Sequence, residues 1–104
     1  MKTSELTGAA LDWAVAQIES GAGPDKAEKQ WRYFGRVFHP STDWSQGGPI
    51  IELEEIAIGK STDHWKAFSG EFDLAEGPTP LIAAMRCYVA SKLGDTIDVP
   101  SELV

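Results

Sequence analysis

The sequence predicts a small α+β protein in which a small antiparallel sheet of about three strands packs against N- and C-terminal helices. Two observations predict this fold class. Apolar residues recur at helical spacing near both ends of the chain. Short aromatic and β-branched runs, separated by Gly and Pro, occupy the middle. With 104 residues the chain has the length of one domain, so we expect residues 1–104 to form a single domain.

The first predicted element is a helix over Gly8–Ser20. Leu11, Val15 and Ile18 recur at i, i+4 and i+7 and form one apolar stripe, and Asp12 is expected to lie away from it. The threonine before the helix can cap it, because a side-chain oxygen can accept from a free N–H of the first turn. A Gly-Ala-Gly-Pro run follows and is expected to end the helix.

The next segment, Asp25–Phe38, allows two interpretations. Its bases recur at helical spacing: Lys26, Lys29, Arg32 and Arg36. That spacing suits a helix, whereas the aromatic residues and the final Val-Phe pair favour a strand over about residues 31–38. We favour the strand and leave the helix as the alternative for residues 26–36.

Turn residues dominate the segment that follows. We expect an N-cap within Pro40–Asp43, where a short turn begins. This turn is expected to close at Gly47–Pro49. Pro49 can then open a short helix over Ile50–Glu55, because proline suits the first helical position.

Two more strands are predicted before the C-terminal helix. Residues 56–58 alternate as a strand does, residues 64–68 form the next one, and residues 59–63 form the turn between them. Phe72 and Leu74 are expected to anchor the loop that follows.

The C-terminal helix has the clearest signals in the sequence. Thr79 is a suitable N-cap, Pro80 fits the first helical position, and Gly94 is placed to end the helix after Leu93. A broad apolar face predicts core residues: Leu81, Ala84, Met85, Tyr88 and Val89. The polar face is narrow and centred on Arg86, with Ala83 and Ala90 beside it.

Composition restricts the classes of function. The 16 acids and 9 bases give a net charge of -7, which repels nucleic-acid phosphate, so we expect no direct binding of nucleic acid. The single cysteine cannot form an internal disulfide, and no Cys/His pattern has zinc spacing. The N-terminus has no hydrophobic signal core, and no apolar run approaches the ~20 residues of a membrane helix. We therefore expect a cytoplasmic protein without membrane contact.

Two stretches carry a resemblance to a known family: PSTDWSQGGPIIE at residues 40–52 and GPTPLIAAMRCYV at residues 77–89. Together with the helix that follows Leu6 and Thr7, they resemble the small NinX-like proteins of tailed phages and prophages. The matching stretches cover roughly half of the chain. The family has no assigned activity, so the resemblance implies a phage or prophage origin and action in the host cytoplasm, without a particular reaction.

Catalytic and metal-binding interpretations are weaker than structural ones. A hydrolase would use Ser41 as nucleophile and His39 as base, but residues this close in sequence rarely form a working triad, so capping by Ser41 or Asp43 is favoured. His64 beside Asp63 matches no recurrent metal motif, and the Gly-rich turns lack phosphate-loop spacing. We assign no catalytic residue, cofactor or metal.

Charged and aromatic groups leave an interaction function as the leading hypothesis. The bases of residues 26–36 and a set of acids suit solvated faces: Glu52, Glu54, Glu55, Glu71, Asp73 and Glu76. Trp44 and Trp65 are expected in the core, with a partner-binding role as the alternative.

We therefore predict a phage accessory protein that binds an unidentified host or phage protein, with Ser41, Asp43, Trp44 and Trp65 as the interaction or loop site. The alternatives are a small enzyme or ligand-binding domain that uses the His39–Asp43 loop, or an acidic nucleic-acid mimic. The sequence leaves open whether the chain forms a homo-oligomer.

Overall fold

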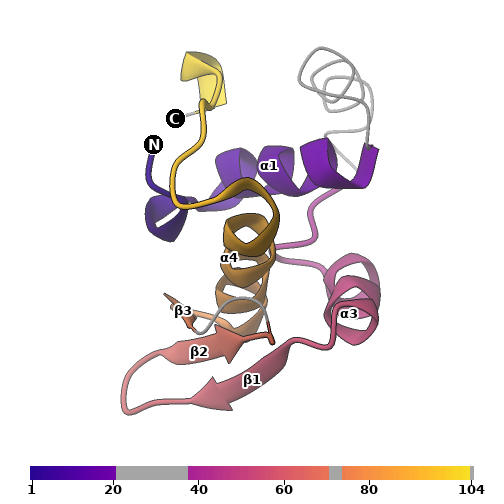
Figure 1. Cartoon of the computed structure of the whole chain (residues 1–104), viewed down its shortest axis with the longest axis vertical. Coiled ribbons are helices and arrows are strands. Elements are labelled where there is room, and N and C mark those ends of the chain that lie inside the picture. The colour runs from indigo at the N-terminus through magenta and orange to yellow at the C-terminus, as the bar shows by residue number, and fades with distance from the viewer. Residues whose placement is uncertain (21–37, 71–73, 104) are drawn as a thin grey trace.

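The computed structural model describes residues 1–20, 38–70 and 74–103 and has the α+β fold that the sequence predicts (Figure 1). Within these ranges three α-helices and a three-stranded antiparallel sheet form the fold. The helices are α1 (Gly8–Ser20), α3 (Trp44–Leu53) and α4 (Pro80–Leu93), and the strands are β1 (Ala57–Lys60), β2 (Trp65–Phe68) and β3 (Ala75–Gly77). Short 3-10 turns lie near the two ends, η1 (Thr3–Glu5) and η2 (Ser101–Leu103).

The strands are ordered β1-β2-β3, and both pairs are antiparallel. Ile58 lies opposite Ala67, and Lys66 lies opposite Glu76. The first two strands confirm the predicted hairpin, although β1 extends through Lys60 into the predicted turn. The sequence does not predict β3, since Ala-Glu-Gly has little strand propensity, and pairing with β2 provides its hydrogen bonds. The predicted strand over 31–38 and the alternative helix over 26–36 lie outside the described residues, except Phe38, which is not in a strand.

Helix α4 lies between the sheet and α1, and its core role is confirmed (Figure 1). Thr79 caps it by accepting from the N–H of Ile82, and Gly94 ends it at a φ of 90°, which favours glycine. The buried set includes an alanine expected on the polar face: Leu81, Ala83, Ala84, Met85, Cys87, Tyr88 and Val89. Arg86 is partly buried, and its Nε donates a hydrogen bond to the carbonyl of Leu6 at 2.7 Å.

Helix α1 has the predicted bounds and apolar stripe. Leu11 and Val15 are fully buried, and Ile18 packs at the edge of the core. Asp12, expected away from this stripe, is nevertheless buried, with only 4% of the residue exposed. The main-chain N–H of Ser41 donates to Asp12 Oδ1 at 2.9 Å and supplies the hydrogen bond that a buried carboxyl needs.

Helix α3 differs most from the prediction. It begins at Trp44 and runs through Gly47–Pro49, which the sequence analysis placed at the end of a turn. Gly47 lies close enough to the loop before the helix that a Cβ there would sit 2.5 Å from the carbonyl oxygen of Pro40. Burial of Gly47 and Ile50 against the core therefore outweighs the local preference of Gly and Pro for a turn.

The two ends of the described chain are joined by hydrogen bonds. The N–H of Thr3 donates to the carbonyl of Asp95 at 2.7 Å, and the Thr3 hydroxyl donates to the carbonyl of Gly94 at 2.6 Å. Ile97 exchanges hydrogen bonds with Met1. The segment after α4 thus holds the first residues in place beside α1. None of the helices in the described ranges has the length and apolar character to span a membrane.

Candidate functional site

The loop before α3 contains the residues that the sequence analysis singled out. Asp43 is the N-cap, because its Oδ1 accepts from the N–H of Ser45 at 2.9 Å and from the Ser45 hydroxyl at 2.6 Å. These hydrogen bonds lower the pKa of Asp43. His39 Nε2 lies 3.8 Å from Asp43 Oδ2, an ion-pair distance when the imidazole is protonated. The capping role predicted for Asp43 is thus confirmed, and this carboxylate organises the start of the helix.

Ser41 is a buried residue of this loop and does not cap the helix. It is 2% exposed, and its main-chain N–H is bound to Asp12. The Ser41 hydroxyl lies near the Asp12 carboxyl and favours the ionised form of Asp12. It makes no hydrogen bond of ordinary geometry with the described residues. Burial raises the pKa of Asp12, and contacts with Ser41 and the charge of His39 oppose this rise. A substrate therefore has no direct path to the Ser41 hydroxyl in this conformation.

The two tryptophans of the predicted site lie in different elements. Trp44 is the first residue of α3 and is 54% exposed, so the expectation that it belongs to the core was wrong. Trp65 lies in β2 and packs against the core at its edge, with Lys60 Nζ 5.1 Å from its ring centre. Ser41, Asp43 and Trp44 thus belong to the loop and the start of α3, whereas Trp65 lies in the sheet.

An apolar groove runs along the flank of α3 that lies opposite Trp44. It has a volume of about 310 Å³ and lies between this helix and the end of α1; its lining residues are Glu19, Phe38, Gln46, Pro49, Ile50 and Leu53. Leu53 is 82% exposed, more than any other large apolar side chain in the described ranges. Nine positions separate Trp44 from Leu53, which places them about 180° apart around the axis of α3. The groove and Trp44 therefore belong to different flanks.

Carboxylates flank Leu53 at the C-terminal end of α3: Glu52 precedes it, and Glu54 and Glu55 follow it and line a separate hollow. Glu52 and Glu55 are exposed, and neither forms an ion pair with another described residue. Glu54 pairs with Lys92, whose Nζ lies 3.4 Å from Glu54 Oε2. The last turn of α3 carries no basic residue, although the carbonyl end of a helix favours positive charge. Among the described residues, the end of this helix therefore carries an excess of negative charge.

The histidine of the β1–β2 turn, His64, is a second titratable group with close partners. His64 Nδ1 is 2.6 Å from Asp63 Oδ1, and His64 Nε2 is 3.4 Å from Glu76 Oε1. The hydrogen bond with Asp63 is the main cause that raises the pKa of His64, and Glu76 adds to it. The contact with Glu76 is electrostatic rather than a well-aligned hydrogen bond. Among the described residues no group of three or more His, Cys, Asp or Glu side chains is arranged to hold a metal ion.

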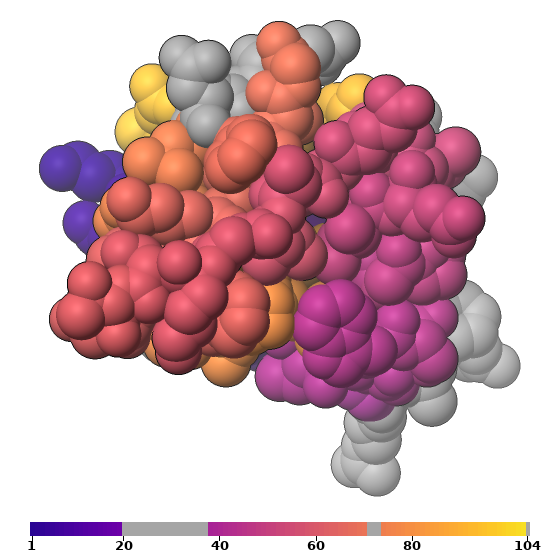
Figure 2. Space-filling view, turned by 90° about the horizontal axis from the view of Figure 1, so that it is seen from below, coloured from indigo at the N-terminus to yellow at the C-terminus, as the bar shows by residue number. Residues whose placement is uncertain are grey.

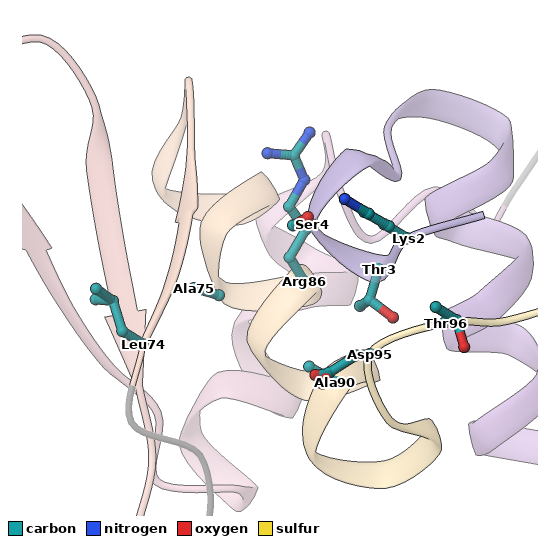
Figure 3. A pocket seen from close by; sticks show the side chains of 9 residues that line it. All are labelled: Lys2, Thr3, Ser4, Leu74, Ala75, Arg86, Ala90, Asp95 and Thr96. Carbon is teal, nitrogen blue, oxygen red and sulfur yellow. The ribbon is translucent and has the colours of Figure 1, made fainter.

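A further hollow of about 220 Å³ lies between the N-terminus, β3 and α4 (Figure 3). Lys2, Arg86 and Asp95 are the charged residues among those that line it. Arg86 donates through Nε to the Leu6 carbonyl and through Nη1 to the Glu76 carbonyl, and burial lowers its pKa. This guanidinium is thus used to join η1 and β3 to α4, and it is not a free anion-binding group.

The exposed part of α3 shares one face of the molecule with the β1–β2 hairpin (Figure 2). The chain passes directly from the helix into β1 through Glu54–Ile56, so the acidic end of α3 meets the sheet there. A scan against protein families matches residues 2–92 to the family described as Bacteriophage P22, NinX. The chain belongs to this family. No curated protein matches it.

Membership of the NinX family confirms the resemblance found in the sequence and makes the chain a phage accessory protein. The matched range includes α3, its groove and the acidic residues after it. The residues after α4 that bind Met1 and Thr3 lie beyond the match.

Sequence reasoning missed two residues of this NinX-family chain. Asp12 stands alone as an acid between Ala9 and Ala16, and that isolation was a signal for a buried, partnered carboxyl. Leu53 is a single apolar residue among Glu52, Glu54 and Glu55, which is a signal for an exposed anchor. The exposure of Leu53 depends on where α3 begins, because the start of the helix determines which side chains face the core.

Proposed function

We propose that this phage accessory protein acts by binding another protein, of host or phage origin, through the flank of α3 that carries Leu53. The observation that carries the proposal is the exposure of Leu53, 82%, beside an apolar groove. Leaving a leucine in water forfeits roughly 1.5–3 kcal/mol of burial energy, which a partner recovers when it covers the side chain. Interface anchors are commonly large apolar side chains next to a preformed depression.

The loop at residues 39–43 supports binding rather than catalysis. A hydrolase needs an accessible nucleophile hydrogen-bonded to a base. The Ser41 hydroxyl is buried, and the His39 ring faces Asp43 at 3.8 Å. In this arrangement the loop fixes the start of α3 against α1, which holds the groove in shape. Trp44 offers a second exposed contact on the other flank of the helix.

Photocrosslinking in infected cells tests this function. A benzoylphenylalanine is placed at position 53 of the full chain during expression from a phage, and adducts are identified by mass spectrometry. We expect one dominant protein adduct. The matched control carries the same group at Leu93, which is 37% exposed at the end of α4. Equal adducts from both positions, or none from position 53, would contradict the proposal.

A second arm asks whether Leu53 itself supplies binding energy. Leu53→Ser should leave the unfolding midpoint close to that of the unaltered protein, because the side chain is already exposed. It should nevertheless reduce recovery of the crosslinked partner in a pull-down from the same cells. Trp44→Ser, on the opposite flank, shows whether the partner also reaches that side of α3.

A further inference from the structure

We infer that the partner presents a basic peptide segment with one large apolar side chain, which enters the groove while its cations meet the carboxylates at the end of α3. This inference rests on the interaction function proposed above and adds the chemistry of the partner. Both halves of the description meet at Leu53. This side chain lines the apolar groove together with Glu19, and the carboxylates Glu52, Glu54 and Glu55 flank it along the chain.

The groove determines the apolar part of the partner. Phe38, Pro49, Ile50 and Leu53 supply carbon surface, and the volume of about 310 Å³ gives room for a large side chain. Ile50 is buried and Leu53 is exposed, and both line the groove, so an entering group would contact both. An aliphatic or aromatic side chain is the group that gains free energy by leaving water here.

The carboxylates in and beside the groove determine the charged part of the partner. Glu19 lies within the lining, and Glu52 and Glu55 are exposed on either side of Leu53 in the sequence. Lys92 Nζ lies 3.4 Å from Glu54 Oε2 and offsets the charge of that carboxylate. The carbonyl end of the helix adds to the negative potential. Lysine or arginine side chains on the partner complement this field, whereas an acidic segment is repelled.

The backbone at Glu55 offers a way to separate charge from folding. Glu55 adopts a φ of 54°, the left-handed conformation in which a helix normally ends on Gly or Asn. An L-residue with a long side chain is strained there by comparison with glycine. Replacement by glycine therefore removes the carboxylate without a cost to the fold.

A second copy of the chain fits this surface less well than a basic segment does. Two-fold dimers place the same patch of each protomer against itself. Here that would bring the carboxylates of one copy against those of the other, in a chain with a net charge of -7. Charge complementarity therefore favours a basic partner.

Three labelled peptides test the chemistry by fluorescence anisotropy with the full chain. The first has a central tryptophan flanked by lysines, the second has the same tryptophan flanked by glutamates, and the third has lysines without an apolar residue. We expect saturable binding of the first alone, weakening as salt rises. Equal binding of the first two peptides would overturn the inference, and so would equal binding of the first and third.

Glu55→Gly separates binding from folding. Glycine relieves the left-handed backbone, so the unfolding midpoint should rise, while affinity for the lysine–tryptophan peptide should fall about two- to fivefold, the size typical of one exposed ion pair. Glu52→Gln should lower the affinity by a similar factor without changing the midpoint. Leu53→Ser should lower it by about tenfold or more. Unchanged affinity in both Glu variants would overturn the inference.

The outcomes distinguish this inference from the proposed function. If position 53 crosslinks to a partner in cells but neither the peptides nor the Glu variants show a preference for basic chemistry, the function stands and the inference fails. If position 53 gives no adduct, the function fails first. A concentration-dependent increase in mass during sedimentation, abolished by Leu53→Ser, would identify a second copy as the occupant and also overturn the inference.

Discussion

The main-chain N–H of Ser41 donates to Asp12 Oδ1 at 2.9 Å and joins the loop before α3 to the middle of α1. Asp12 is 4% exposed and Ser41 2% exposed, so water cannot replace either partner. The hydrogen bond closes the loop that carries His39 and Asp43, and it therefore sets the position from which α3 begins. The groove on α3 depends on this contact although neither residue lines it.

Removal of the Asp12 carboxyl should destabilise the protein. Asp12→Ala leaves the Ser41 N–H buried without an acceptor and should cost about 1–3 kcal/mol in urea unfolding. Asp12→Asn keeps an acceptor oxygen in the same place and should cost distinctly less. Equal losses in the two variants would mean that the hydrogen bond contributes little and that packing dominates.

Asp12 also predicts a pH dependence. Burial raises the pKa of Asp12 above 3.8, so the folded state holds this proton more tightly than the unfolded state. The stability from protonation is present at low pH and is lost as pH rises from 3.8 through the folded-state pKa. Comparison of urea unfolding of the unaltered protein with Asp12→Asn over this range should isolate the contribution. A flat difference between the two proteins would contradict the raised pKa.

Two adjacent glycines in α3 should respond oppositely to alanine. At Gly47 a Cβ would lie 2.5 Å from the Pro40 carbonyl oxygen and 2.7 Å from Leu81 Cδ2, so Gly47→Ala should destabilise by ~1–3 kcal/mol. Gly48 has nothing within 4 Å of such a Cβ, and Gly48→Ala should stabilise the helix by ~0.5–1 kcal/mol. Thermal unfolding of both variants checks the pair, and stabilisation by Gly47→Ala would show that the loop does not approach the helix as described.

His64 should titrate above its ordinary range. Asp63 and Glu76 raise the pKa of His64 above 6.5, so their stabilising contacts are fully present below pH 6.5 and are lost as pH rises through the folded-state pKa. An NMR titration of the imidazole should show the raised midpoint. Asp63→Asn should lower this midpoint more than Glu76→Gln, since the hydrogen bond with Asp63 is the larger cause. The reverse order would place the main partner in β3.

Helix α4 should be the most sensitive element to truncation. Met85 is fully buried between the sheet and α1, and Met85→Ala should cost about 2–5 kcal/mol. Leu93→Ala at the exposed end of the same helix is the matched control and should cost well under half as much. Similar losses from both changes would mean that this helix does not form the centre of the core.

The elements that depend on local signals were predicted correctly, and those that depend on tertiary packing were not. Thr79, Pro80 and Gly94 are local signals, and α4 begins and ends where they indicate. In α3 the local signals misled, because Gly47 and Pro49 are typical turn residues that tertiary packing holds within a helix. The hydrogen bonds of β3 likewise depend on β2, so three residues of low strand propensity form a strand.

The candidate site follows the same division. The sequence indicated the loop through Asp43 and the family through residues 40–52 and 77–89, and these signals are local or inherited as continuous runs. It could not assign Trp44 to the surface or Asp12 to the interior. Exposure depends on which elements meet, and Asp12 meets Ser41 from a distance of 29 positions along the chain.

Signals in neighbouring residues were enough to predict the α+β class, the bounds of α1 and α4, the β1–β2 hairpin and the NinX family, because caps, apolar periodicity and contiguous motifs are local. Contacts between distant segments were needed to show that α3 runs through its glycines, that β3 completes the sheet and that Leu53 is exposed beside a groove. Burial and the local field at a residue are sums over groups that are distant in sequence, and those groups come together when the chain folds.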